Sequence, residues 1–267
     1  MRGETLERAF LSAATGVQSL LELDELRGNR VYLGSEFCER LLPAKDGFIG
    51  ALKLAENLNI KVTLLTPPFS EKGIKLFEGF IREIAKPGEF DFEVVFNDWG
   101  VIEILENFPR FERIMGRVIA SHYDNSYYAD VAGFPGVFLE FLKEKQIHAV
   151  EFNSVRQFLG ARDQLAGCNI RTHLYYPFAY LKVTRFCESV KTSGRYSRDA
   201  IGFCAKECMN VRGGIRHERV KTNFLARGNA WFSRIEDNLD APGLKPDRIV
   251  YNNLYFDERI PVPSKLC

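Results

Sequence analysis

A regular recurrence of short, β-rich apolar runs constrains the fold of this chain more than any other feature. The runs begin near residues 30, 60, 92, 117, 147 and 168, and helical patterns lie between them. Because a strand and its crossover helix together take about 30 residues, this spacing predicts right-handed βαβ units and a parallel sheet. Six such units in succession favour a single-domain (β/α) barrel-like, or TIM-barrel-like, α/β fold over an open sheet.

The segment after the first run also favours a barrel. An open doubly wound sheet usually carries a glycine-rich phosphate loop after its first strand. Here the run 30–34 leads into Gly34-Ser-Glu-Phe-Cys38, which lacks such a loop. Two later runs, 229–233 and 248–251, are candidates for the strands that complete the barrel.

The regular pattern fails in two parts of the chain. Residues 5–26 carry a helical apolar pattern that Gly28 would end, so we expect an N-terminal helical extension over residues 1–28. Beyond Tyr176 the spacing is lost, and we interpret residues 177–230 as an irregular segment that contains cysteines. Since no linker divides the sequence, residues 1–267 are expected to form one domain.

The composition is that of an ordinary globular protein, with 46% hydrophobic residues, 27% charged residues and a net charge of +1. No apolar run approaches the roughly 18–20 residues that cross a bilayer, and the first residues lack the apolar core of a signal peptide. We therefore expect no membrane span and a cytoplasmic location. Thiols stay reduced there, so clustered cysteines indicate a metal site or catalysis rather than disulfides.

Four of the six cysteines have a spacing that suits a metal site. Cys204 and Cys208 form a C-x3-C pair, Cys187 precedes them, and Cys38 follows the first run. In a parallel barrel the carboxyl ends of the strands share one face, where these cysteines can meet. One short pair with two single cysteines favours an iron–sulfur cluster over zinc, whose structural sites usually have two short pairs. Ordinary buried or surface thiols are the alternative interpretation.

The surroundings of these cysteines are basic. Between Lys182 and Arg227 the chain has eleven Lys or Arg residues and four Asp or Glu residues. Positive charge would stabilise an anionic cluster or an anionic substrate, while a solvated basic face and a nucleic-acid surface are the alternatives. Cys168, which we expect inside a strand, and the terminal Cys267 are not expected to be ligands.

Four motifs follow one another from residue 32 to residue 208. They are Tyr32-Leu-Gly-Ser-Glu-Phe-Cys38-Glu-Arg40, Asn97-Asp-Trp-Gly100, His173-Leu-Tyr-Tyr-Pro-Phe-Ala-Tyr180, and Cys187 with the Cys204–Cys208 pair. Together they resemble the collagenase-like peptidase superfamily, in particular its UbiV-like branch. Leu174 stands where that branch usually has glycine, and two spacings differ near Cys187, so the sequence resembles a divergent member.

The resemblance implies a barrel-like fold with a 4Fe–4S cluster on the four cysteines, and it makes residues 177–230 the cluster-binding segment. UbiV-like proteins act in oxygen-independent hydroxylation during ubiquinone biosynthesis, together with a sibling protein of the same superfamily. A hydroxylase subunit that acts on a small aromatic, quinone-precursor-like substrate in a hetero-oligomer is therefore the first expectation. A cluster-bearing scaffold without its own catalysis and an RNA-modifying relative are the alternatives, with nucleic acid the less expected partner.

No active peptidase is expected, because the sequence has no Ser/His/Asp arrangement and no His-Glu-x-x-His zinc motif. Other polar residues at strand ends are candidates for chemistry on the same face of the barrel. The candidate catalytic residues are Asp98, His173 and Arg185, the last of which could pair with the cluster or an anionic substrate. Asp98 as a helix N-cap and His173 as a hydrogen-bonded core residue are the structural alternatives.

Candidate substrate-binding residues lie near the same strand ends. They are Tyr176, Tyr180, Asn125 and Glu151. A pocket lined by tyrosines would suit a planar substrate such as a phenol or a nucleobase. Packing at the top of a barrel explains the tyrosines equally well, and a turn explains Asn125.

Overall fold

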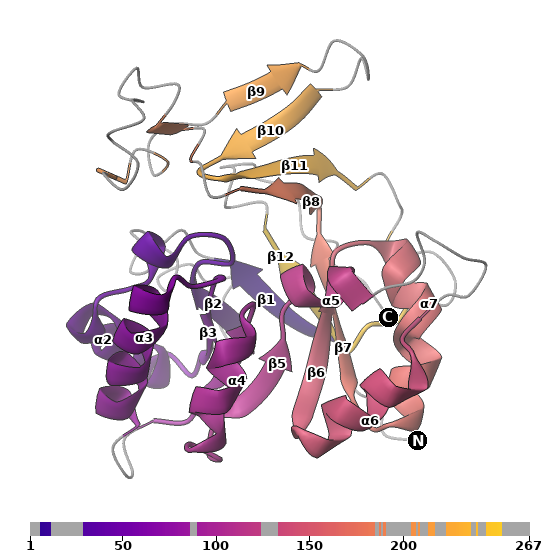
Figure 1. Ribbon diagram of the computed structural model, residues 1–267, viewed down its shortest axis with the longest axis horizontal. Helices are drawn as coiled ribbons and strands as arrows, with labels where there is room; N and C mark the ends of the chain where they lie inside the picture. The colour runs from indigo at the N-terminus through magenta and orange to yellow at the C-terminus, as the bar shows by residue number, and fades with distance from the viewer. Residues whose placement is uncertain are drawn as a thin grey trace.

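The computed structural model describes residues 6–11, 29–85, 90–123, 133–184, 204–206, 213–216, 223–235 and 244–252, and single positions 187, 189, 190, 208 and 239. These residues form a closed barrel of eight parallel strands and a four-stranded antiparallel sheet beside its mouth (Figure 1). The predicted TIM-barrel-like α/β fold is confirmed.

The barrel strands follow chain order until β12 closes the ring between β7 and β1. Each strand pairs in parallel with both neighbours, so the carboxyl ends of all eight open on one face. The strands are β1 (Glu7–Leu11), β2 (Arg30–Gly34), β3 (Lys61–Leu65), β4 (Glu93–Phe96), β5 (Glu112–Met115), β6 (Ile147–Phe152), β7 (Arg171–Tyr176) and β12 (Arg248–Tyr251).

Helices cover the outside of the barrel with their apolar faces inward. In α3, Phe77, Ile81 and Ile84 are buried at helical spacing. Side chains accept backbone N–H groups in the first turns of three helices, namely Ser70 for α3, Asp98 for α4 and Ser154 for α7. The helices are α2 (Lys45–Asn57), α3 (Glu71–Ile84), α4 (Trp99–Glu106), α5 (Arg117–Tyr123), α6 (Gly136–Glu144), α7 (Val155–Gly167) and the short 3-10 helix η2 (Glu39–Leu41).

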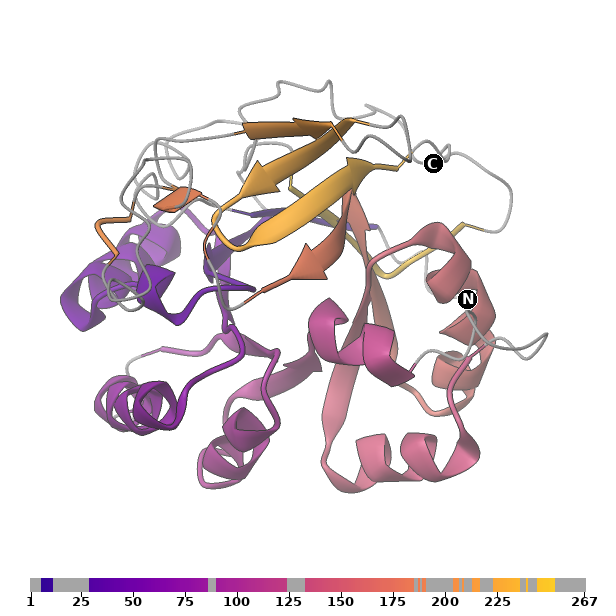
Figure 2. The same cartoon turned by 45° about the horizontal axis from the view of Figure 1, so that its top comes forward.

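The antiparallel sheet continues directly from the barrel, because β8 begins two residues after β7 ends. Its strands run in the order β8-β11-β10-β9 and cross above the barrel in Figure 2. They are β8 (Phe178–Val183), β9 (Gly213–Arg216), β10 (Asn223–Arg227) and β11 (Ala230–Arg234). An apolar cluster of Phe37, Val118, Phe178, Ala230 and Phe232 joins this sheet to the barrel mouth.

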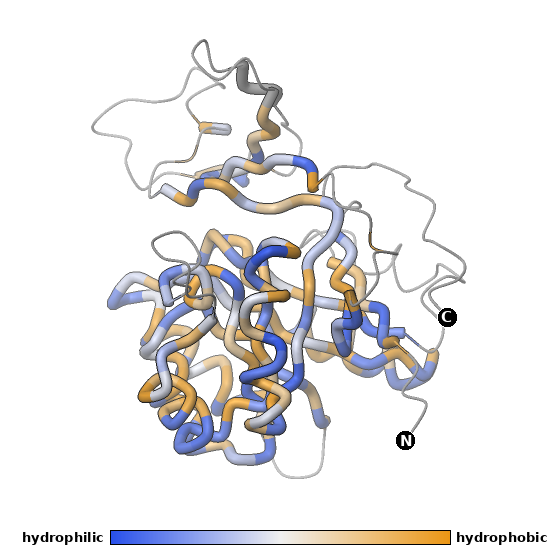
Figure 3. The backbone as a smooth tube through the Cα atoms, turned by 90° about the vertical axis from the view of Figure 1, so that its right-hand side faces the viewer, coloured by the Kyte–Doolittle hydropathy of each residue, from blue (hydrophilic) through white to orange (hydrophobic). Residues whose placement is uncertain are grey.

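Two further apolar clusters hold the barrel itself. A large one lies between strands and helices, and a smaller one lies inside the barrel, where it includes Leu65, Val95 and Ile114. Figure 3 shows hydrophobic stretches spread through the barrel body and continuing into the sheet above it. No helix among the described residues is both long and apolar enough to cross a membrane.

The predicted N-terminal helix is wrong for residues 7–11, which form β1. This strand pairs with β2 and β12 and so closes the barrel. Ala9 and Leu11 face the inside of the barrel, whereas Phe10 faces the helices, which is the two-residue alternation of a strand. In a segment as short as residues 7–11, the same apolar residues fit both a helical stripe and the alternation of a strand. Residues 12–28 of the predicted extension lie outside the described residues.

The strand predicted at Arg117 is also wrong, because Arg117 begins helix α5 and the strand, β5, ends just before it. The β-branched residues Val118 and Ile119 suggested a strand, but both are buried as part of a helical turn. Gly116 marks the change of direction. A Cβ atom there would lie 2.2 Å from Oδ1 of Asn97, so a side chain would clash.

The segment 177–230 is more regular than expected wherever it is described, since it contributes strands to the antiparallel sheet. The run at 229–233 was expected in the barrel but forms β11 of that sheet, whereas the run at 248–251 closes the barrel as predicted. Cys168 is not inside a strand. It is the half-buried residue that follows helix α7.

Candidate functional site

The carboxyl end of β2 delivers Cys38 to the mouth of the barrel. Gly34 has a φ of +125°, and a Cβ there would lie 2.2 Å from the carbonyl oxygen of Leu65, so only glycine fits. The Ser35 hydroxyl then accepts the backbone N–H groups of Phe37 and Cys38, at 3.3 and 3.2 Å. This tight turn places the half-buried Cys38 just before η2.

The other three candidate ligands come from the late segment. Cys187 and Cys204 are half-buried, and Cys208 is buried. The backbone N–H of Lys206 donates to Sγ of Cys204 at 3.3 Å, and the Arg227 side chain donates to the carbonyl oxygen of Cys208 at 3.2 Å.

Two of the four thiols have pKa values raised by burial and by the neighbouring cysteines. Burial first, and then Cys187, Cys38 and Cys204, together raise the pKa of the Cys208 thiol to about 12. Burial also raises the pKa of Cys38, and Cys204 and Cys187 add to the shift. Since such effects need proximity, the structure brings all four predicted ligands into one neighbourhood. Within the described residues, no three His, Cys, Asp or Glu side chains converge closely enough to hold a metal ion.

A buried ion pair connects this neighbourhood to the barrel. Both Glu36 and Arg117 are inaccessible to solvent, and two hydrogen bonds of 2.6 and 2.7 Å join the carboxylate to the guanidinium. Arg117 also donates to Oδ1 of Asn153 at 3.1 Å and to the carbonyl oxygen of Phe178 at 3.0 Å. Burial opposes the charge on Arg117, but Glu36 outweighs it and the pKa of Arg117 rises.

Aromatic rings surround the same guanidinium. Its carbon lies 3.7 Å from the ring centre of Tyr175, 5.5 Å from that of Tyr180 and 5.9 Å from that of Phe37. Tyr180, a predicted substrate-binding residue, is half-buried and its hydroxyl contacts the hydroxyl of Ser121. The structure therefore places Tyr180 at the mouth, next to the ion pair.

Glu151 and His173 lie side by side inside the barrel, below the ion pair. Adjacent strands pair these residues in register, and Nδ1 of His173 lies 3.8 Å from Oε1 of Glu151. Burial, and secondarily Glu36, raises the pKa of Glu151 to about 8, so its carboxyl group is neutral at pH 7. Burial, and then Arg248, lowers the pKa of His173 well below its usual range. Within the described residues, neither Nε2 of His173 nor Oε1 of Glu151 has a hydrogen-bond partner.

Asp98 is a helix N-cap, which was the structural alternative to a catalytic role. Its carboxylate caps α4 by accepting the backbone N–H of Gly100 at 2.9 Å, and it accepts the N–H of Phe69 at 2.8 Å. Tyr176 packs edge-on against Tyr251 in the core outside the barrel, so the structure does not bring it to the thiols. Arg185 and Asn125 lie outside the described residues.

Comparison with solved structures identifies the fold. The structure of the U32 peptidase Mk0906 matches with a TM-score of 0.50 and 11% sequence identity, over 94% of this chain and 94% of that one. This chain shares its fold. At such low identity the likeness to the U32 peptidase establishes the barrel and nothing about activity. No family model and no curated protein sequence matches the chain.

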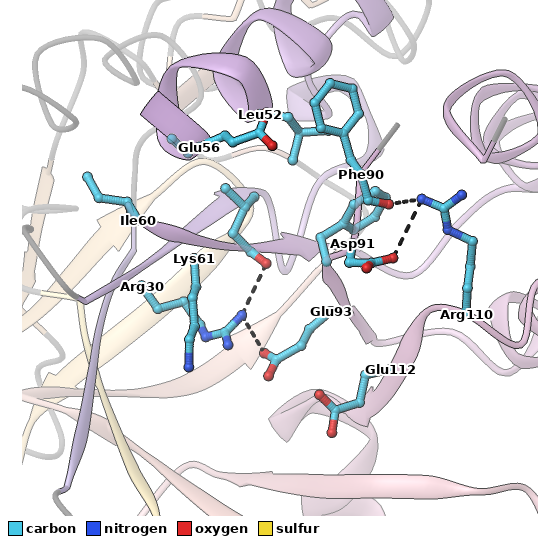
Figure 4. A pocket seen from close by; sticks show the side chains of 13 residues that line it. Arg30, Leu52, Glu56, Ile60, Lys61, Phe90, Asp91, Glu93, Arg110 and Glu112 are labelled. Carbon is cyan, nitrogen blue, oxygen red and sulfur yellow. Dashed lines mark hydrogen bonds and ion pairs between the residues drawn. The ribbon is translucent and has the colours of Figure 1, made fainter. Parts of the chain in front are cut away.

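The opposite end of the barrel carries an ion-pair network instead. Arg248 donates to Glu93 at 2.7 and 2.8 Å and to Glu7 at 2.6 Å. Arg30 joins the same two carboxylates at 3.1 and 3.2 Å. An open cavity of about 960 Å³ lies beside this network (Figure 4). Several of its charged residues are paired, among them Arg110, which is bound to Phe90 and Asp91. The cavity lies at the amino ends of the strands, where barrels carry stability rather than chemistry.

Sequence reasoning missed the Glu36–Arg117 pair. Glu36 lies in the Tyr32–Arg40 motif, where only Cys38 was predicted to have a function. Arg117 begins the segment that was predicted to be a strand. The signal that could have found Arg117 is the glycine before it, because Gly-Arg directly after an apolar run is typical of a strand end. The partners themselves are 81 residues apart and have no local signature.

Proposed function

We propose that this chain is an iron–sulfur protein whose 4Fe–4S cluster is held by Cys38, Cys187, Cys204 and Cys208 at the carboxyl end of the barrel. The observation that carries the proposal is that the hairpin turn of Gly228 and Asn229 contacts the segments of Cys38, Cys187 and Cys208 at the barrel mouth. Iron–sulfur clusters are held by cysteine thiolates, and four is the usual number.

The surroundings of the thiols suit a cluster. Backbone N–H groups donate to sulfur at two of them, from Lys206 to Cys204 and from Arg40 to Cys38. The positive charges of Arg40 and Arg227 favour the thiolate forms of Cys38 and Cys208, respectively. Hydrogen bonds to sulfur and nearby charge are the means by which proteins stabilise and tune such clusters.

The spacing of the cysteines along the sequence favours a cluster over zinc. Structural zinc sites usually contain two short cysteine pairs. Here one short pair, Cys204 and Cys208, combines with the single residues Cys38 and Cys187. This arrangement supports an iron–sulfur cluster.

For the reaction we propose a subunit of an oxygen-independent hydroxylase that acts on a small aromatic substrate beside a sibling protein. A bound cluster would supply one-electron redox chemistry. At the mouth, the half-buried Tyr180 ring packs against Phe37 and near the buried Arg117 guanidinium, and such an aromatic setting suits an aromatic substrate. Below the mouth, Glu151 holds a proton at neutral pH, and the Tyr175 hydroxyl donates to it at 3.1 Å.

One observation favours a scaffold without catalysis as the second candidate. The aromatic cluster of Phe37, Phe178 and Phe232 packs into the mouth, and each of these side chains is buried. A substrate would have to displace part of that packing. A partner protein would then do the chemistry, with this chain supplying the cluster.

The experiment replaces each proposed ligand with alanine in protein purified without oxygen. We expect each of the four variants to lose most of its iron and its visible absorption, whereas Cys168→Ala keeps both. Incubation with the sibling protein, a phenolic substrate, a chemical two-electron acceptor and water labelled with heavy oxygen then separates the two candidates, because the proposed hydroxylation takes oxygen from water and releases two electrons and two protons. A product heavier by one oxygen, lost in Glu151→Gln with the cluster intact, supports catalysis by this chain, and full activity of that variant supports the scaffold.

A further inference from the structure

The two-residue turn between β10 and β11, Gly228–Asn229, contacts three of the four cysteine-bearing segments. The strands on either side pair through Arg227 and Ala230, so these two residues alone form the hairpin loop. Gly228 has a φ of +61°, which a two-residue hairpin turn of this kind requires at its first position. The turn points back toward the barrel mouth rather than into solvent, since Gly228 is buried.

Asn229 bridges the segments of Cys38 and Cys187 with one amide group. Its Nδ2 atom donates to the carbonyl oxygen of Phe37 at 2.7 Å and to that of Thr184 at 2.8 Å. Phe37 directly precedes Cys38, and Thr184 is three residues before Cys187. The backbone of Thr184 also donates to the carbonyl oxygen of Asn229 at 2.9 Å. Both hydrogens of the amide are therefore used to hold two cysteine segments that are distant in sequence.

Gly228 and Arg227 contact the segments that carry Cys187 and Cys208. The backbone N–H of Gly228 donates to the hydroxyl of Ser189, two residues after Cys187, at 3.1 Å. A Cβ atom on Gly228 would lie 3.6 Å from Cβ and 3.8 Å from Sγ of Cys208, so the turn lies against that cysteine. Arg227 fixes the Cys208 backbone.

We propose that Asn229 is the positioning residue of the cysteine site, which holds the Cys38 and Cys187 segments together before any metal or cluster binds. The inference deepens the proposed function, but it rests on protein–protein hydrogen bonds that need no cofactor. Asn229 is not a ligand and acts through the backbone of its neighbours. Loss of these hydrogen bonds is expected to lower the population of the assembled site about tenfold, which corresponds to about 1.4 kcal/mol.

The test uses the full chain without metal and dibromobimane, a reagent that becomes fluorescent only when it bridges two nearby thiols. We expect the wild-type chain to form the Cys38–Cys187 bridge, mapped by peptide mass. Asn229→Asp should form it about tenfold more slowly, because a carboxylate facing two carbonyl oxygens repels them. The matched control is Asn252→Ala, which removes an amide that holds Phe178 at 2.7 and 3.0 Å and touches no cysteine segment.

A wild-type rate in Asn229→Asp, or an equal loss in Asn252→Ala, would overturn the inference. Should Asn229→Asp fail to fold, Asn229→Ser keeps one donor and is expected to give an intermediate rate. In the protein loaded with iron and sulfide, the same variants are expected to shift the cluster's midpoint potential, while Asn252→Ala leaves it unchanged. A wild-type chain that binds no iron when iron and sulfide are supplied, but shows the normal bridging pattern, would contradict the proposed cofactor and leave the role of Asn229 standing.

Discussion

The two ends of the barrel interior differ in whether their buried titratable groups are paired ions or are kept neutral. At the amino ends of the strands, Arg30, Glu7, Arg248 and Glu93 form ion pairs with one another. At the carboxyl ends, the Glu36–Arg117 ion pair is buried above the neutral carboxyl group of Glu151. The charges of the first network are therefore paired within the protein. The second end holds protons and thiols whose state can change, which is where barrels place their chemistry.

The largest expected effect comes from breaking the single ion pair of the carboxyl end. Arg117→Met leaves the Glu36 carboxylate buried without its partner, which should reduce the free energy of unfolding by about 3–5 kcal/mol. Urea denaturation measures the change. The double variant Arg117→Met/Glu36→Gln should recover much of the loss, and a double variant as unstable as the single one would show that packing matters more than charge.

The neutral carboxyl of the same end should respond to pH in the opposite sense to ordinary acids. The pKa of Glu151 is raised from 4.5 to about 8 by burial, so the folded protein keeps a proton that the unfolded chain releases. Stability should therefore fall as pH rises from about 4.5 to 8 and then level off.

Glu151→Gln removes that dependence. At pH 8 the variant should be more stable than the wild type by a few kcal/mol, and near pH 4 the two should be alike. Unfolding measured across this range checks the sign. Parallel curves for the two proteins would mean that Glu151 is already ionised in the folded state.

The paired end should show the usual acid sensitivity. Burial opposes ionisation of Glu93, but Arg248 and Arg30 outweigh it and lower its pKa well below 4.5. Its contribution to stability is present above about pH 4.5 and is lost as pH falls below that. Glu93→Gln should cost about 2 kcal/mol at pH 7 and flatten the acid limb of the stability curve. An unchanged acid limb would show that the network does not depend on this carboxylate.

The smallest expected effect is at Asp98, which lies on the carboxyl face but acts as a helix cap. Asp98→Ala should lower the free energy of unfolding by about 1 kcal/mol and leave cluster content unchanged. Thermal unfolding and iron counts check both parts. Loss of iron together with normal stability would show that Asp98 contributes to the cluster site and does not act only as a helix cap.

The architecture could be predicted from the sequence because its signals are local. The spacing of apolar runs predicts βα units, and the strand-end rule predicts that Cys38 can approach distant cysteines. The errors arose where two periodicities fit one short segment, as at Phe10, or where a contact with Asn97 requires glycine at 116. The bridging contacts of Arg117 and Asn229 could not be predicted, since their partners are distant in sequence and include backbone carbonyl groups.

The functional difference between the two ends of the barrel therefore depends on whether the four thiols at the carboxyl end bind an iron–sulfur cluster. The most direct measurement counts iron and acid-labile sulfide per chain in protein purified without oxygen, together with its electron paramagnetic resonance spectrum after reduction. We predict about four iron and four sulfide per chain and the spectrum of a reduced 4Fe–4S cluster. A colourless protein with one zinc ion per chain, or with no metal after iron and sulfide are supplied, would contradict the account.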